Sequence, residues 1–182
     1  MKPLLFRAAF LFCGALIQVS LSNTVFFSSI VSPPILLAMV VSITLFRGFS
    51  FSWGWAIVAG FFLDALVLGR LGHASIEFVL LAALLSLTAK ELLFEYHVGR
   101  IVFLGGLIWM FEVVLRLIEV FALSLISESG LSSAAFFSGL RWTMLPVSFL
   151  VSLGVCAIVL PITFSFERYV DLFERTKVGR RR

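Results

Sequence analysis

Charged and amide side chains are scarce in this sequence. Only 13% of its 182 residues are Asp, Glu, Lys or Arg, whereas 61% are hydrophobic, and there is one asparagine and one glutamine. Polar groups for catalysis are therefore few. The sequence also lacks metal-ligand spacing, a phosphate-binding glycine loop and a nucleophile elbow. We expect a protein that is not an enzyme, holds no metal or cofactor and binds no nucleic acid.

Cysteine is nearly absent too. Cys13 and Cys156 both lie inside apolar runs, so we interpret them as small core residues rather than as a disulfide or a metal pair. A lipoprotein signal ending at Cys13 is disfavoured by the bulky Phe12 before it. A cleaved signal peptide is disfavoured because no small-x-small cleavage site is present and further apolar runs follow. The first run is therefore predicted to be a retained helix.

Long polar segments are missing as well. A bilayer core of about 30 Å is crossed by about 20 apolar residues in a helix, and runs of this kind recur along the chain. We predict an all-α integral membrane protein, a compact bundle of six transmembrane helices (residues 1–166) with a basic cytoplasmic tail (residues 167–182). Pro33 and Pro34 are placed in the first turn of the second span, where a missing N–H costs little. The predicted spans are 4–22, 30–46, 53–68, 74–94, 101–126 and 143–166.

Basic residues set the predicted orientation. One side of the membrane receives eleven of them: Lys2, Arg7, Arg47, Lys90, Arg100, Arg168, Arg175, Lys177, Arg180, Arg181 and Arg182. The opposite side receives Arg70 and Arg141, and Arg116 lies within a span. Because basic residues accumulate on the cytoplasmic side, both termini are predicted to be cytoplasmic. Trp109, deep in the fifth span, is not explained by the aromatic belts at membrane interfaces.

A few ionisable residues interrupt the apolar runs. Asp64 is the most informative, because a carboxylate in hydrocarbon costs roughly 2.5–3.5 kcal/mol on insertion scales and needs a partner, a hydrogen bond or water. Depths counted along the spans predict that five charged residues gather in the outer half of the bundle: Asp64, Glu77, Glu112, Arg116 and Glu119. Four more residues would surround them: Arg70, His73, Glu128 and Arg141.

Two interpretations of these charges stay open. They form either a polar pocket or docking site that opens outward, or an internal network in which Arg116 bridges Glu112 and Asp64 and fixes the helix packing. Helical spacing supports the pairing of Glu112 with Arg116 more firmly than any pairing between helices. The amphipathic, basic tail has two interpretations as well: an anchor to an anionic leaflet, or a docking segment for a cytoplasmic protein.

The stretch from Pro34 to about Leu93 resembles the bacterial rod shape-determining protein family MreD. The family shows a proline opening the second span, a basic residue, a Gly-x-x-x-Asp in the next span and a glycine turn that ends in Leu-Gly. The matching residues here are Pro34, Arg47, Gly60, Asp64, Gly69, Leu71 and Gly72. One position departs from the pattern: Ile35 follows Pro34, where family members often have an acidic residue.

The resemblance implies a non-catalytic scaffold subunit of the cell-elongation machinery in the bacterial inner membrane. Its partners would be an MreC-type protein, the MreB filament, and the RodA and penicillin-binding-protein pair that synthesises peptidoglycan. The family is similar in fold to the substrate-binding subunits of energy-coupling-factor vitamin transporters. This gives an alternative function: a solute-binding subunit in which Asp64, Glu112 and Arg116 hold a polar ligand. Those subunits often carry Ala-x-x-x-Ala in their first helix, whereas this chain has Ala9-x-x-x-Cys13.

Overall fold

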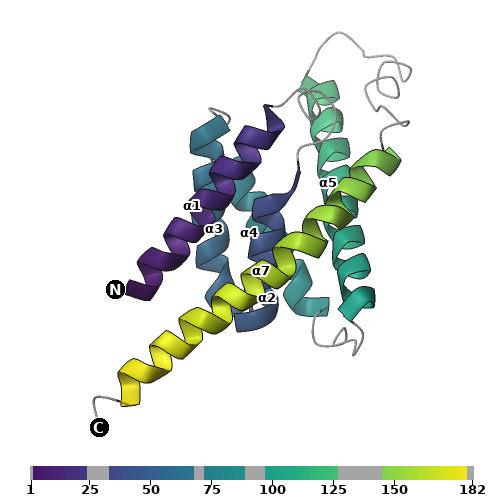
Figure 1. Ribbon diagram of the computed structural model, residues 1–182. Coiled ribbons are helices and arrows are strands. Elements are labelled where there is room, and N and C mark those ends of the chain that lie inside the picture. The colour runs from purple at the N-terminus through teal and green to yellow at the C-terminus, as the bar shows by residue number, and fades with distance from the viewer. Residues whose placement is uncertain (1, 24–32, 68–71, 89–96, 127–144, 180–182) are drawn as a thin grey trace.

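The fold is all-helical in the part of the chain that the computed structural model describes, residues 2–23, 33–67, 72–88, 97–126 and 145–179. Consecutive helices run in alternating directions, and α7 crosses the front of the bundle diagonally (Figure 1). The described helices are α1 (Lys2–Ser22), α2 (Ile35–Arg47), α3 (Phe49–Val67), α4 (His73–Thr88), α5 (His97–Ile126) and α7 (Leu145–Gly179).

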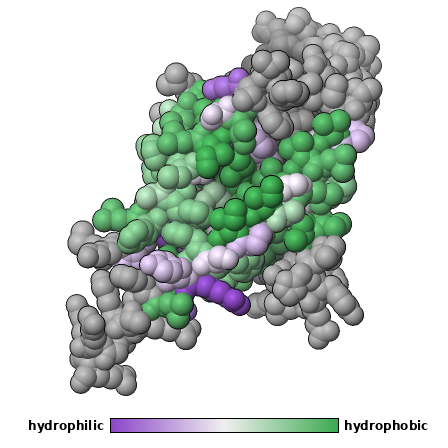
Figure 2. All heavy atoms as spheres, in the orientation of Figure 1, coloured by the Kyte–Doolittle hydropathy of each residue, from purple (hydrophilic) through white to green (hydrophobic). Residues whose placement is uncertain are grey.

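Three of these helices are long and apolar enough to cross a membrane: Pro3–Ser22, Phe49–Val67 and Leu145–Leu172. The other three have shorter apolar stretches, at Ile35–Arg47, His73–Leu87 and Ile101–Leu115. The predicted all-helical class is confirmed, with three helices that could cross a membrane by their length and composition, and the bundle of six spans stays a prediction. Apolar side chains also cover much of the visible surface (Figure 2), as a hydrocarbon environment requires.

Helix α2 is the core of the bundle. All of its residues from Ile35 to Thr44 are buried, and it packs against α1, α3, α4 and α7. A helix that is apolar on every face must be enclosed by other helices or by lipid. Its two polar side chains do not disturb this, because the Ser42 hydroxyl donates to Ala38 O and the Thr44 hydroxyl donates to Val40 O.

The start of α2 has a cap from a neighbouring helix. Pro34 is the N-cap residue and Ile35 the first helical residue, so the two prolines precede the first turn in which we placed them. The backbone N–H of Leu36, which has no intrahelical acceptor, donates to Oε1 of Gln18 in α1 at 2.9 Å. The one glutamine of the sequence thus satisfies the end of the most buried helix.

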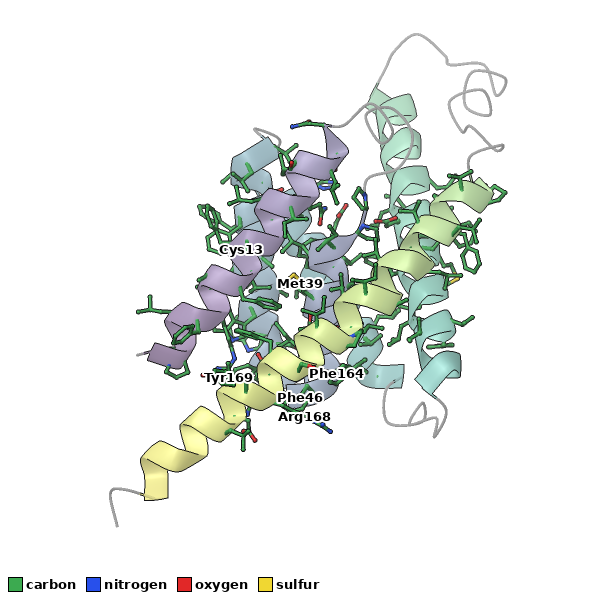
Figure 3. The ribbon with its side chains drawn as sticks, in the orientation of Figure 1. Cys13, Met39, Phe46, Phe164, Arg168 and Tyr169 are labelled. Atoms are coloured by element: carbon green, nitrogen blue, oxygen red, sulfur yellow. The ribbon has the colours of Figure 1, made fainter. Side chains whose placement is uncertain are left out.

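Helix α7 continues past the predicted boundary between bundle and tail. It runs unbroken from Leu145 to Gly179, so residue 166 does not coincide with a helix end. Aromatic contacts hold its middle to the bundle: Phe166 stacks on Phe10 at 4.1 Å, and Phe164 meets Phe46 edge-on at 6.0 Å (Figure 3). The segment that we expected to be a separate tail begins as part of the packed helix.

Candidate functional site

Asp64 lies in the last turn of α3 and accepts two hydrogen bonds from the backbone that starts α4. The N–H of Gly72 donates to Oδ2 at 2.7 Å, and the N–H of Ala74 donates to Oδ1 at 3.2 Å. The residue is only 7% exposed. Since the N-terminus of a helix has free N–H groups and a partial positive charge, it suits a carboxylate. The hydrogen-bonding partner that Asp64 needs in an apolar run is therefore the backbone at the start of α4.

Two glycines make this arrangement possible. Gly72 has a φ of +94°, a conformation that other residues rarely adopt. At Gly60, one turn before Asp64, a Cβ would meet the backbone Cα and N of Ser75 and lie 2.6 Å from the carbonyl carbon of Ala74. We call Gly60, Asp64 and Gly72 the hairpin cap, because together they join α3 to α4. Gly69 lies outside the described residues.

The hydroxyl of Ser75 adds a further link in the same place. It donates to the carbonyl oxygen of Ile57 at 3.2 Å, so the first turn of α4 bonds to α3 on both sides of Gly60. Small residues at helix interfaces in membranes allow this approach of two backbones. The hairpin cap is thus a packing device made from residues that the sequence had singled out.

The other acidic residues of the predicted cluster that the structure describes, Glu77 and Glu112, have surroundings different from those of Asp64. Glu77 Oε1 lies 3.2 Å from His73 Nδ1, one turn apart at the start of α4. Glu112 is in α5, the helix that packs on α7. Within the described residues the extensive packing of α5 is on α7, whereas Asp64 lies where α3 packs on α4, so these extensive contacts do not bring Glu112 to Asp64.

Two members of the predicted cluster cannot be placed in it. The backbones of Arg116 and Glu119 belong to α5, but their side chains lie outside the described part of the structure. The predicted bridge from Arg116 to Asp64 and Glu112 depends on the Arg116 side chain and therefore also lies outside the described part of the structure. Both carboxylate oxygens of Asp64 already accept backbone N–H groups, which is the network that the structure does describe.

A second group of charges lies at the opposite end of the bundle, where α2 ends and α3 begins. Glu167 of α7 accepts two hydrogen bonds from Arg7 of α1, Nε to Oε1 at 2.8 Å and a terminal nitrogen to Oε2 at 3.1 Å. Arg47 of α2 donates its Nε to the same Oε2 at 3.2 Å and lies 3.1 Å from Asp171 Oδ1 through Nη1. We call Arg7, Arg47, Glu167 and Asp171 the charge cluster.

The charge cluster joins three helices, α1, α2 and α7, and its central pair is deeply buried. Arg7 is 2% exposed and Glu167 is fully buried. The ring of Phe51 in α3 lies 4.9 Å from the guanidinium carbon of Arg7 and 5.6 Å from that of Arg47. Aromatic faces attract cations, and a two-pronged arginine–carboxylate pair is among the strongest hydrogen-bonded contacts. Two arginines and two carboxylates balance in formal charge.

Sequence reasoning missed this cluster, because Arg7 and Arg47 were counted as flanking basic residues and Glu167 as part of the tail. A signal was available. Arg7 lies inside the first apolar run, and Glu167 directly follows the last one, at the same predicted end of the bundle. An arginine inside a span needs a counter-charge, and the nearest acidic candidate at that end was Glu167.

A third contact explains Trp109. Its indole N–H donates to the Ser148 hydroxyl of α7 at 2.8 Å, and that hydroxyl donates to Leu145 O. Phe149 packs edge-on against the indole ring at 5.4 Å. Ser152 and Cys156, four and eight residues after Ser148 on α7, are fully buried. Trp109 therefore fastens α5 to α7.

These arrangements hold helices together rather than offer reacting groups. Among the described residues there is no group of three or more His, Cys, Asp and Glu side chains that could bind a metal. Comparison of the chain with protein-family models, with curated proteins and with solved structures found no match in any of the three.

Proposed function

We propose that this protein is a non-catalytic membrane scaffold subunit of the bacterial cell-elongation complex, similar to MreD. In this proposal it crosses the inner membrane six times with both termini in the cytoplasm, in a bundle similar to energy-coupling-factor substrate-binding subunits. It binds an MreC-type protein and coordinates the MreB filament with the RodA and penicillin-binding-protein synthase.

The role of the MreD-like residues is the observation that carries this proposal. Pro34 occupies the N-cap position of the core helix, Gly60 allows two backbones to approach closely, and Asp64 closes the α3–α4 hairpin with Gly72. Each of them shapes the bundle. A sequence pattern made of such residues suits a protein whose task is to present a rigid surface.

The state of Asp64 favours a scaffold over the solute-binding alternative. A carboxylate that holds a polar ligand must turn its oxygens toward the ligand. Both oxygens of Asp64 instead accept backbone N–H groups of the same chain. Ligand binding through Asp64 would leave two N–H groups of α4 without an acceptor, which costs roughly 1–3 kcal/mol for each buried group.

The outer surface of α1 is compatible with partner binding within the membrane. Large apolar side chains of α1 are exposed in a continuous series: Leu4, Leu5, Phe6, Phe12, Leu16, Ile17 and Leu21. Lipid or the helix of a partner protein can cover such a surface equally well, because both are apolar.

The experiment is co-purification with an MreC-type protein from the same genome. We expect the two proteins to remain together in mild detergent, and we expect Gly60→Leu to weaken the complex while Gly54→Leu does not. A Cβ at Gly54 meets nothing within 4 Å, so this variant controls for the added side chain. A chain that purifies alone with a bound vitamin would establish the solute-binding alternative, and a chain that purifies alone and empty would contradict both functions.

A further inference from the structure

Two buried hydroxyl groups of α7 are not bonded in the usual way. Hydroxyls inside helices commonly donate to a carbonyl oxygen three or four residues earlier, as those of Ser42, Thr44 and Ser86 do. Ser152 Oγ and Thr163 Oγ1 have no hydrogen-bond partner in the structure as described, although both residues are fully buried. A hydroxyl buried in this way has lost its hydrogen bonds to water, so a partner for each has to be found.

These two hydroxyls belong to a polar side of α7 that faces into the bundle. We call Ser148, Ser152, Cys156, Thr163 and Glu167 the polar face. Its members follow one another at intervals of four or seven residues, which places them on one side of a helix. All but the partly buried Ser148 are fully buried. From residue 148 to residue 167 the helix covers about 28 Å, close to the thickness of a hydrocarbon core of about 30 Å.

Glu167 has a hydrogen-bond position left beside Thr163. A carboxylate offers about four acceptor positions, and three arginine N–H groups occupy one of them on Oε1 and two on Oε2. The remaining position is therefore on Oε1. Thr163 lies one helical turn before Glu167, and side chains at this spacing have their Cβ atoms about 5–6 Å apart. Two hydrogen bonds of about 2.8 Å that meet at one oxygen atom cover such a distance.

Ser148 offers a similar position beside Ser152. A hydroxyl has one donor and two acceptor positions. The hydroxyl of Ser148 donates to Leu145 O and accepts from the indole of Trp109, which leaves one acceptor position. Ser152 follows one turn later on the same side of the helix. Each unbonded hydroxyl thus lies one turn from an oxygen that can accept another hydrogen bond.

The chemistry of these two places selects a small neutral ligand. Beside Glu167, a cation would be repelled by Arg7 and Arg47, and an anion by the carboxylates of Glu167 and Asp171. Beside Ser148, two neutral hydroxyls cannot replace the hydration of an ion. Water fits both places, because it donates as well as accepts and occupies protein interiors where buried polar groups lack partners.

We propose that the polar face of α7 binds two internal water molecules, one between Thr163 and Glu167 and one between Ser152 and Ser148. Each water accepts from the unbonded hydroxyl and donates to the oxygen one turn away. The first water supplies the fourth hydrogen bond of the Glu167 carboxylate and so takes part in the solvation of the charge cluster. This inference concerns the packing of α7 and does not depend on a role in cell elongation.

The direct test is water-edited solid-state NMR of the full, isotope-labelled chain in lipid bilayers. The experiment measures how fast magnetisation passes from water protons to the side-chain carbons of each residue. We expect fast transfer to Thr163 and Ser152 and slow transfer to Thr44, which is also buried but bonds to its own helix. Transfer to Thr163 and Ser152 that is as slow as transfer to Thr44 would overturn the proposal.

Stability variants test whether the hydroxyls hold the waters. Thr163→Val keeps the shape of the side chain and removes the hydroxyl, and Thr44→Val makes the same change at a hydroxyl bonded to its own helix. We expect Thr163→Val to raise the unfolding equilibrium constant in detergent roughly 2- to 10-fold more than Thr44→Val does. Ser152→Ala should exceed its control Ser42→Ala in the same way.

The opposite sign would overturn the proposal. A hydroxyl that binds nothing is relieved by its removal, so Thr163→Val would then be stabilising relative to Thr44→Val. Destabilisation by Thr163→Val together with slow transfer from water would overturn it as well, because the hydroxyl would then bond to a group of the protein.

Discussion

At the scale of single residues, Asp64 shows how a carboxylate is accommodated in an apolar protein. It receives two N–H groups at the start of α4, and these donors have no partner within their own helix. The carboxylate and the helix end would each be unfavourable alone in a membrane. Together they satisfy each other, and the residue needs neither a cation nor water.

Replacing Asp64 tests this cap. Asp64→Asn keeps one oxygen acceptor but turns an NH2 group toward the second N–H, so we expect a loss of about 1 kcal/mol. Asp64→Ala leaves both N–H groups unpaired and should cost roughly 2–5 kcal/mol. Thermal unfolding in detergent measures the order wild type, Asn, Ala. Glu77→Gln, in the partly exposed pair with His73, is the control and should change stability by less than about 1 kcal/mol. Equal stability of the three Asp64 forms would contradict the cap.

Replacing Gly60 tests the close approach of α3 and α4. A Cβ there would meet the backbone of Ser75, which cannot move without shifting α4. We expect Gly60→Ala to lower stability by roughly 1–3 kcal/mol. In Gly54→Ala, on the same helix with nothing within 4 Å, the higher helix propensity of alanine should be neutral or stabilising by up to about 1 kcal/mol. Similar melting temperatures for the two variants would show that α3 and α4 are not in close contact.

At the scale of elements, α7 is held near both ends of its membrane stretch. Toward its start, Ser148 accepts from Trp109 of α5, and toward its end, Glu167 accepts from Arg7 and Arg47. The first contact is a single neutral hydrogen bond, worth on average about 0.6 kcal/mol between membrane helices. The second is a buried ionic contact and should dominate the position of the helix.

Replacing Glu167 tests whether the buried ionic contact dominates the position of α7. Glu167→Met removes the carboxylate shared by two arginines and should cost roughly 3–5 kcal/mol, because a buried guanidinium is left unpaired. The double variant Arg7→Met with Glu167→Met should cost less than the sum of the two single changes, which a double-mutant cycle measures. Arg168→Gln is the matched control, since this neighbour is exposed and should change stability by no more than about 0.5 kcal/mol. Additive single changes would show that the two charges do not interact.

At the scale of the whole molecule, the helices predict how the protein behaves in a cell. Three of them are long and apolar enough to cross a bilayer, so we expect the chain to stay in the membrane fraction after alkaline carbonate extraction. Reporter fusions test the proposed six spans. A fusion after residue 182 should report the cytoplasm, and one within residues 127–144 should report the opposite side. The same compartment for both would contradict this topology.

The fold class could be predicted from the sequence because it depends on local composition. Apolar runs of sufficient length identify α1, α3 and α7, whichever helices surround them. The hairpin cap could also be predicted in part, since Gly60, Asp64 and Gly72 lie within thirteen consecutive residues. The charge cluster was harder to predict, because Arg7 and Glu167 are 160 positions apart and the sequence relates them only through their places at the same end of the predicted bundle.

The sequence by itself determined that the chain consists of apolar helices, that Asp64 needs a hydrogen-bonding partner, and that the net positive charge lies at the C-terminal end. These features follow from which side chains are present and from their spacing along the chain. Only the tertiary structure decided that α2 is enclosed on all sides, that Trp109 bonds to α7, and that Arg7 and Arg47 share Glu167. In an almost uniformly apolar chain, nearly every helix face is equally suited to packing, so the partners of each helix are selected by a few polar groups and glycines that meet only when the whole bundle has formed.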